Sequence, residues 1–204
     1  MFSCERRLSR WLLPFGSGTI AADPDMGTSK TRLWRCAMYE ARKICNLLLD
    51  GFDAVAFDLT NLRLNKLLFF IHAESLRYRP DGLVRNHFEA WQYGPVIRPV
   101  FDAFKRYGDA PIQAPAMYLD YATGMQKPVP FDDIRPEDRK IIEVEFERYS
   151  PFTTGQLVSL SHVKGGPWDV VYREHLADPT KSPHISNKVI RSYFSGESKF
   201  TSRH

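Results

Sequence analysis

The sequence has few cysteines and none of the spacings that make cysteine a metal ligand or a redox centre. Its three cysteines, Cys4, Cys36 and Cys45, form no CxxC pair. An odd number of cysteines without a repeating framework is typical of a reducing compartment. The missing CxxC also removes the usual signature of zinc sites and thioredoxin-like chemistry. We therefore expect neither a metal nor another cofactor in this chain.

Long hydrophobic runs are also absent. The longest uninterrupted apolar run is Leu67–Ile71, far below the roughly 20 residues that a membrane-spanning helix needs. Near the N-terminus, arginines precede a partly apolar stretch as in a signal peptide, but Arg10, Pro14 and two glycines interrupt that stretch. The sequence thus predicts a cytoplasmic protein without a membrane partner.

Motifs of the common enzyme classes are missing too. The chain has no phosphate loop of the GxGxxG or GxxxxGK[ST] type, and no GxSxG or HExxH. Cys45 lies on an apolar helix face and His72 within a hydrophobic helix, so we expect both to be core residues. Glu143, Glu145 and Glu147 alternate along a helix and point in different directions, which favours a solvated face over a metal site.

Charge is distributed unevenly along the chain. The formal net charge is +4, but residues 1–35 carry a net +3, residues 180–204 a net +4, and residues 36–179 a net −3. A slightly acidic body argues against a face that reads nucleic acid, because it would repel phosphates. We expect no nucleic-acid partner for this body, and the sequence indicates no particular small-molecule ligand.

One folded domain is expected over residues 37–195, because apolar residues make up 43% of the chain and supply a core. Residues 1–36 contain helix breakers and no steady apolar period, which predicts a disordered N-terminal extension. Residues 196–204 predict a C-terminal tail. Helical spacing begins near Met38 and predicts a first helix that ends near Gly51.

A very apolar segment, Leu62–Leu76, predicts the central helix of the fold. Thr60 can cap its start, and its apolar residues cover most of the helix circumference. The turn at 80–82 and the alternating residues after it predict a short hairpin or extended segment. Residues 109–134 predict a long surface connection. Further helices are expected to start at Gly94 with Pro95 in the first turn, at Pro136, at Thr153 or Thr154, at Pro167, and after a cap at Ser186.

These elements predict a mainly α fold of the α+β class. We expect a compact helical domain around a central apolar helix, with one short β-hairpin or extended segment. Because the other predicted helices are amphipathic, they can bury their apolar faces against the central one.

Two junctions combine glycine, proline and large aromatics: FEAWQYGPV, residues 88–96, and LSHVKGGPWDVVY, residues 160–172. In each, glycine gives backbone freedom, proline fixes the start of the next helix, and an aromatic can cover the corner. Aromatics of this kind also anchor protein interfaces. We take no residue as catalytic. The candidate partner-binding residues are Trp91, Tyr93, Gly94, Pro95, His162 and Trp168.

The sequence resembles the Panacea, or SocA-like antitoxin, family in four segments: LNKLLFFIHAESL (64–76), FEAWQYGPVIRPVFDAFKRYG (88–108), LVSLSHVKGGPWDVVYRE (157–174) and HISNKVIRSYF (184–194). Their order and spacing match as well, and AMYEARKICNLLL resembles the usual first helix of the family. The resemblance implies a cytoplasmic bacterial or phage antitoxin, paired with a toxin from a neighbouring gene that it neutralises by binding. The chain departs from the family in its extra residues 1–36 and at Ser161, where the family often has threonine.

Two function classes remain open on the sequence. The first is a binding module, an antitoxin that binds its cognate toxin protein directly. The second is an enzyme, a small hydrolase that uses His162 with a nearby acid. A phage-associated protein-interaction adaptor is a further alternative. A nucleophile within a polar cluster in a pocket would distinguish the enzyme from a binding module.

Overall fold

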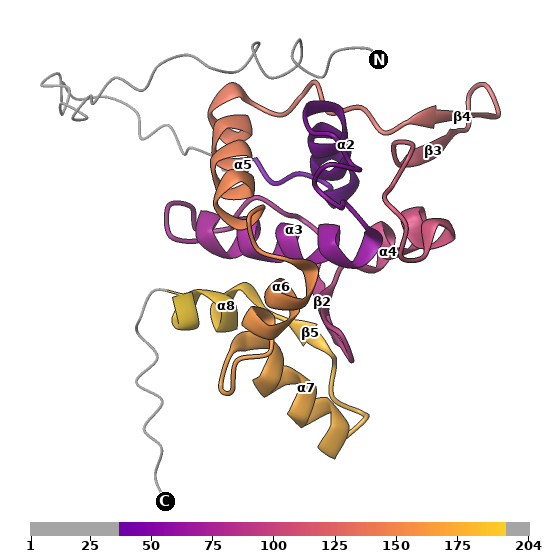
Figure 1. The fold of residues 1–204 in the computed structure, drawn as a ribbon. Coiled ribbons are helices and arrows are strands. Elements are labelled where there is room, and N and C mark those ends of the chain that lie inside the picture. Colours follow the sequence, from indigo (N-terminus) through magenta and orange to yellow (C-terminus); the bar gives the residue numbers. More distant parts are fainter. Residues whose placement is uncertain (1–36, 195–204) are drawn as a thin grey trace, which may run out of the picture. The chain divides into compact units, whose positions relative to one another are not determined.

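The computed structural model describes residues 37–194, and its mainly α architecture with small antiparallel sheets confirms the predicted fold class (Figure 1). The predicted extension over residues 1–36 and the tail over residues 196–204 lie outside the described residues. The elements are, in chain order, α2 (Ala41–Gly51), α3 (Asn61–Ser75), β1 (Phe88–Trp91), β2 (Gly94–Val96), α4 (Arg98–Phe104), the 3₁₀ helix η1 (Lys105–Tyr107), β3 (Met117–Asp120), β4 (Met125–Pro128), α5 (Pro136–Tyr149), α6 (Thr154–Ser161), α7 (Pro167–Ala177), β5 (His184–Ile185) and α8 (Asn187–Phe194).

Helix α3 is the central helix that the sequence predicts. Its N-terminus is capped by Thr60, whose Oγ1 accepts a hydrogen bond from the amide of Arg63 at 3.3 Å. Every residue of the helix except Leu62 is buried. Helices α2, α4, α5, α6 and α8 all contact α3. Figure 1 shows α3 crossing the middle of the fold, between α2 and α5 on one side and α6 and α8 on the other.

Helix α2 buries the apolar face that its spacing predicts. Ile44, Cys45 and Leu48 are fully buried, and the Glu40 carboxylate caps the helix by accepting from the amide of Arg42. Burial raises the pKa of the Cys45 thiol well above its ordinary value. Cys45 is therefore the small core residue that the sequence predicts, and not a reactive thiol.

A three-stranded antiparallel sheet, with the order β2-β1-β5, joins segments that are far apart in the chain. In the β1–β2 hairpin, Ala90 pairs with Pro95 and Trp91 with Gly94. The predicted helix start at Gly94, with Pro95 in its first turn, is therefore wrong. Gly94 has a φ of +97°, which a right-handed helix does not permit. Pro95 lies on an edge strand, where its missing N–H is tolerated, and Pro99 occupies the first turn of α4 instead.

A second hairpin, β3–β4, lies within the segment that the sequence predicts to be a long surface connection; residues 117–128 lie largely at the surface, but the absence of regular structure expected there is wrong. All of β4 is exposed, and β3 has no alternation of buried and exposed residues. The sequence therefore shows no period of two from which a strand could be predicted. Asn46 of α2 fixes the base of this hairpin, because its side-chain amide donates to the carbonyls of Ala116 at 3.0 Å and Val129 at 2.9 Å.

The remaining helices begin where the sequence predicts. Pro136 opens α5 and Pro167 opens α7. Thr153 caps α6 in a capping box with Gln156. The Ser186 hydroxyl accepts from the amide of Val189 at the start of α8, at 3.4 Å.

The acidic series on α5 corrects another expectation. Glu147 is exposed, but Glu145 is only 4% exposed because α5 packs against α3. Burial raises the pKa of Glu145, and Arg148 forms an ion pair with its carboxylate at 3.2 Å. The series is thus only partly the solvated face that its alternation predicts. His72 of α3 is the core residue expected, since its Nδ1 accepts from the amide of Val84 at 3.1 Å.

Candidate partner-binding site

The fold brings the two predicted junctions together. The first junction forms the β1–β2 hairpin, and the second forms the end of α6 and the start of α7. The indole Nε1 of Trp168 donates a hydrogen bond to the carbonyl of Trp91 at 2.8 Å. His162 Nε2 lies 3.3 Å from the carbonyl oxygen of Gln92, and the His162 ring lies 3.7 Å from the ring of Trp168. The second junction thus holds the turn of the first.

The six candidate residues differ in how far they reach the surface. Tyr93, at the tip of the hairpin, is 65% exposed. Trp91 and His162 are half-buried. The other three, Gly94, Pro95 and Trp168, are buried. The site therefore has a buried base and one exposed aromatic side chain, that of Tyr93.

Trp91 is held in place by three neighbours. Its ring packs edge-on against Phe101 at 5.0 Å between ring centroids, and the guanidinium of Arg98 lies 5.1 Å from its ring. Its Nε1 donates to the Glu89 carboxylate at 2.8 Å, and Arg98 donates to the same carboxylate at 2.8 Å. Partial burial alone would raise the pKa of Glu89, but the hydrogen bonds from Arg98 and Trp91 outweigh it and lower this pKa. Trp91 thus lies in an ordered cluster beside the exposed Tyr93.

The hairpin rests on Lys66 of α3, a residue that is not among the candidates selected from the sequence. Lys66 is 0% exposed, and its Nζ donates to the carbonyl of Pro95 at 2.9 Å. A Cβ on Gly94 would lie 2.7 Å from Lys66 Cε and 2.7 Å from Ser161 Oγ, so any side chain here would have to displace Lys66 of α3 and Ser161 of α6. Burial lowers the pKa of Lys66 to about 7. The available signal in the sequence was a lysine that interrupts the most apolar stretch of the chain.

Ser161 and His162 carry the hydrolase alternative, and their contacts do not support it. Ser161 Oγ lies 3.2 Å from His162 Nδ1, but it donates to the carbonyl of Val158 at 2.8 Å. Both ring nitrogens of His162 face carbonyl oxygens, of Val158 at 2.6 Å and of Gln92 at 3.3 Å. Because a carbonyl only accepts, Nδ1 at 2.6 Å from the Val158 oxygen carries the hydrogen of that bond, so the nitrogen beside Ser161 offers the serine no lone pair. No carboxylate of the described residues bonds to the His162 ring.

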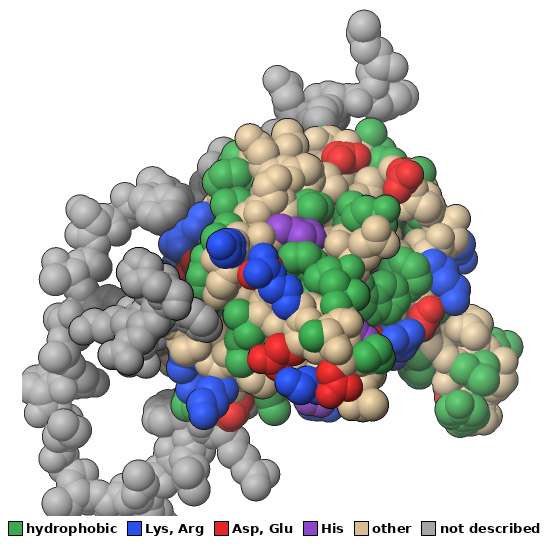
Figure 2. All heavy atoms as spheres, turned by 90° about the horizontal axis from the view of Figure 1, so that it is seen from below, with side chains coloured by type: hydrophobic (Ala, Val, Ile, Leu, Met, Phe, Trp, Pro, Cys, Tyr) green, Lys and Arg blue, Asp and Glu red, His purple; other side chains and the backbone are tan. Residues whose placement is uncertain are grey.

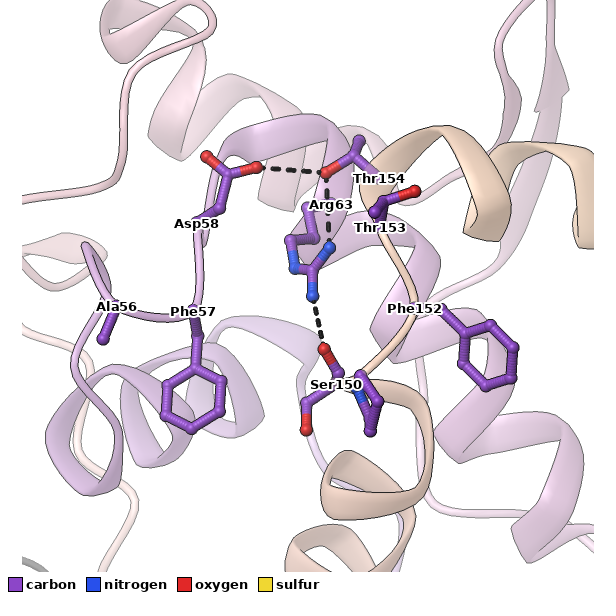
Figure 3. Close-up of a pocket in the computed structure, with 9 residues that line it drawn as sticks. Ala56, Phe57, Asp58, Arg63, Ser150, Phe152, Thr153 and Thr154 are labelled. Carbon is purple, nitrogen blue, oxygen red and sulfur yellow. Dashed lines mark hydrogen bonds between the residues drawn. The ribbon is translucent and has the colours of Figure 1, made fainter.

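A pocket of about 240 Å³ lies at the other end of α6 (Figure 3). Arg63 extends into it from α3, and donates to the carbonyl of Ser150 at 2.7 Å and to the hydroxyl of Thr154 at 3.4 Å. Burial lowers the pKa of Arg63, and the nearby Asp58 carboxylate opposes that shift. The guanidinium thus connects α3 to the end of α5 and the start of α6, and these contacts stabilise the fold.

The described residues offer no metal centre and no membrane span. Nowhere in residues 37–194 are three or more His, Cys, Asp or Glu side chains grouped so that they could hold a metal ion. Among the described helices, none combines the length and apolar character needed to cross a bilayer.

Apolar side chains reach the surface next to the hairpin contact. Leu160 and Val163, which flank Ser161 and His162, are 41% and 42% exposed. Figure 2 shows the molecule from below, the side on which α7 lies in Figure 1, and hydrophobic side chains emerge on this face between charged ones. Leu160 and Val163 thus add apolar surface beside the hairpin.

Comparison with known proteins agrees with the resemblance found in the sequence. A family model described as "Antitoxin SocA-like, Panacea domain" matches residues 64–169. The curated protein "Antitoxin SocA" of Caulobacter vibrioides (strain NA1000 / CB15N) is 35% identical over 158 residues, which cover 76% of this chain and 82% of that protein. No solved structure matches the chain. The matched range 64–169 contains Lys66 and all six candidate residues.

Proposed function

Because the chain belongs to the SocA-like antitoxin family with the Panacea domain, we propose that it is the antitoxin of a toxin–antitoxin system. It neutralises a toxin protein encoded by a neighbouring gene, in the cytoplasm, by direct binding and without a chemical step. Residues 37–195 carry this activity. The observation that supports a binding site at the β1–β2 hairpin is the convergence of both aromatic junctions on one turn.

The turn that carries Tyr93 is held on both sides. Trp168 bonds to the carbonyl that precedes the turn, at Trp91, and Lys66 bonds to the carbonyl that follows it, at Pro95. His162 lies against the turn residue Gln92. A turn fixed in this way loses little conformational entropy when a partner binds, so less of the binding energy of Tyr93 is spent on ordering the turn.

The residue types at the surface are those that dominate binding energy in protein interfaces. Tyr93 is exposed at the turn, and Arg98, at the start of α4, lies next to Trp91 of β1. Tyrosine, tryptophan and arginine are the side chains most enriched among interface hot spots. We therefore place these three residues in the centre of the toxin interface, with Leu160 and Val163 beside them.

Co-expression with the product of the adjacent gene tests this proposal. The adjacent product should be toxic alone, and the full chain should relieve the toxicity at a fixed molar ratio of the two proteins. The variant Tyr93→Ala should lose protection. Tyr121→Ala is the matched control, because Tyr121 is 91% exposed on the turn of the other hairpin, and it should protect fully. Protection at strongly substoichiometric amounts, with turnover of a substrate, would contradict a binding mechanism.

A further inference from the structure

Lys66 is a buried amine with a single protein acceptor. Its ammonium form has three N–H donors, and the bond to the carbonyl of Pro95 at 2.9 Å is the one hydrogen bond that it makes within the described residues. No carboxylate of residues 37–194 forms an ion pair with it. A fully buried lysine is rare and is normally paired with an acid. The binding of a proton at this position is therefore unfavourable while the lysine stays buried.

The β1–β2 hairpin is part of what keeps Lys66 out of water. Strand β2 lies on α3 at this point, with Gly94 directly against the end of the lysine side chain and Pro95 accepting its hydrogen bond. Helix α6 contributes Ser161 on the same side. If β2 moved away from α3, the amine would lose its acceptor and would be hydrated instead.

The surroundings of Lys66 contain no other group that could take over its titration. Gly94, Pro95 and Ser161, which lie at the end of the Lys66 side chain, belong to β2 and α6, and neither of these elements carries an ionisable side chain. The next ionisable groups along the chain are Glu89 on β1, which is paired with Arg98 and Trp91, and His162 after α6, which contacts Val158 and Gln92. On α3 itself, Arg63 is bound to Ser150. Burial is the cause of the lowered pKa of Lys66, about 7, and no charged neighbour contributes to it.

We propose that one proton on Lys66 controls how firmly the β1–β2 hairpin is seated on α3, so that the hairpin opens more readily when this amine is charged. While the hairpin is seated, Lys66 loses its proton at a pH of about 7, whereas a hydrated lysine keeps its proton up to about pH 10.5. Opening therefore takes up one proton from solvent between these two values. Rising pH disfavours opening over this range, and below pH 7 both states carry the proton, so the opening equilibrium no longer changes.

The consequence for partner binding rests on the proposed antitoxin function. Tyr93 has the position described above only while the hairpin is seated, and Lys66 makes that seating respond to pH near neutrality. Lys66 is thus a positioning residue, because it acts on the binding surface through Gly94 and Pro95 and does not reach the surface itself.

Amide hydrogen exchange on the full chain, measured from about pH 7 to about pH 9 and corrected for intrinsic exchange rates, tests the inference. The opening constant of peptides that cover residues 88–96 should fall about tenfold per pH unit, because each opening takes up one proton. Peptides that cover residues 117–128 should show no such slope. The variant Lys66→Met should abolish the slope, whereas Lys105→Met, which removes a lysine with 61% side-chain exposure, should keep it. A flat profile in the native chain, or the same slope in Lys66→Met, would overturn the inference.

A second measurement does not depend on the folding of a variant. In the native chain, the Cε resonance of one lysine should titrate near pH 7 by NMR, and titration of every lysine near 10.5 would also overturn the inference. The affinity for the adjacent gene product, measured at about pH 7 and about pH 9, tests the antitoxin function separately from the role of Lys66. If the adjacent gene product binds at neither pH, the antitoxin function is contradicted. The pH dependence of the exchange still decides the role of Lys66 in that case.

Discussion

The two hairpins of the described chain are held in opposite ways. The β1–β2 hairpin belongs to a three-stranded sheet and lies on α3 and α6, so its second strand is buried throughout. The β3–β4 hairpin has only its own two strands, and all of β4 is exposed. A two-stranded hairpin is marginal by itself, and Asn46 fixes only its base.

Exposure alone does not distinguish the two hairpins as binding surfaces. Tyr93 on the first is 65% exposed, and Tyr121 on the second is 91% exposed. The difference lies in the backbone beneath these side chains. The first hairpin accepts hydrogen bonds from Lys66 and Trp168, and its second strand is buried. A preorganised aromatic, and not the most exposed one, is therefore the better candidate for an interface anchor.

The largest expected effect is the loss of the indole that seats the first hairpin. Trp168→Ala should lower the free energy of unfolding by about 3–5 kcal/mol, as large aromatic truncations in cores do. Trp168 is 7% exposed, stacks on Tyr172 at 4.6 Å between ring centroids, and bonds to Trp91. Chemical denaturation measures this change. A loss below about 1 kcal/mol would mean that the hairpin does not depend on this contact.

Glycine-to-alanine variants in the two hairpins form a matched pair. Both glycines have a positive φ, +97° at Gly94 and +66° at Gly124, so both variants strain the backbone by about 1–2 kcal/mol. Only Gly94→Ala also clashes with Lys66 and Ser161, while nothing lies within 4 Å of a Cβ at Gly124. We expect Gly94→Ala to lose about 2–4 kcal/mol of stability and Gly124→Ala about 1–2 kcal/mol. Equal losses of stability in denaturation experiments would show that Gly94 is not in close contact with Lys66 and Ser161.

Lys66→Met should stabilise the protein at neutral pH by about 1–3 kcal/mol, because it removes a buried amine whose charged form is disfavoured by burial. The pKa of Lys66 is lower in the folded chain, about 7, than the ordinary 10.5. The cost of the lysine is therefore fully present below pH 7 and is lost as the pH rises towards 10.5. The stability difference between variant and native chain should be larger at about pH 7 than at about pH 9. A difference that grows with pH would refute the assignment.

The sequence predicted most of the fold because most of the fold follows local periodicity. The helical spacing around Leu62–Leu76, the cap at Thr60 and the prolines at Pro136 and Pro167 are signals within a few residues. The β3–β4 hairpin has no such signal, since both of its faces are largely exposed. Gly94 was misassigned because glycine followed by proline also starts helices. Gly94 belongs to a strand because it pairs with Trp91 across the hairpin, and the local sequence does not show this pairing.

The residues of the two junctions could be selected from the sequence, but their arrangement in space could not. Trp91 and Trp168 could be selected because each lies in a junction of glycine, proline and aromatics. Their hydrogen bond joins residues that are 77 positions apart, and no local pattern indicates such a contact. Lys66 was missed because the burial of a lysine depends on β2 and α6, which cover it only in the folded chain.

The most direct test is the affinity of the adjacent gene product for two variants. Each replaces one exposed tyrosine, and the two differ only in which hairpin carries the substitution. Both Tyr93→Ala and Tyr121→Ala remove an exposed tyrosine, so each should keep the native stability within about 0.5 kcal/mol. We predict that Tyr93→Ala weakens binding by about 2 kcal/mol or more, roughly thirtyfold, as loss of a hot-spot residue does, and that Tyr121→Ala leaves the affinity unchanged. Full affinity in Tyr93→Ala together with a loss in Tyr121→Ala would contradict the account and assign the interface to the β3–β4 hairpin.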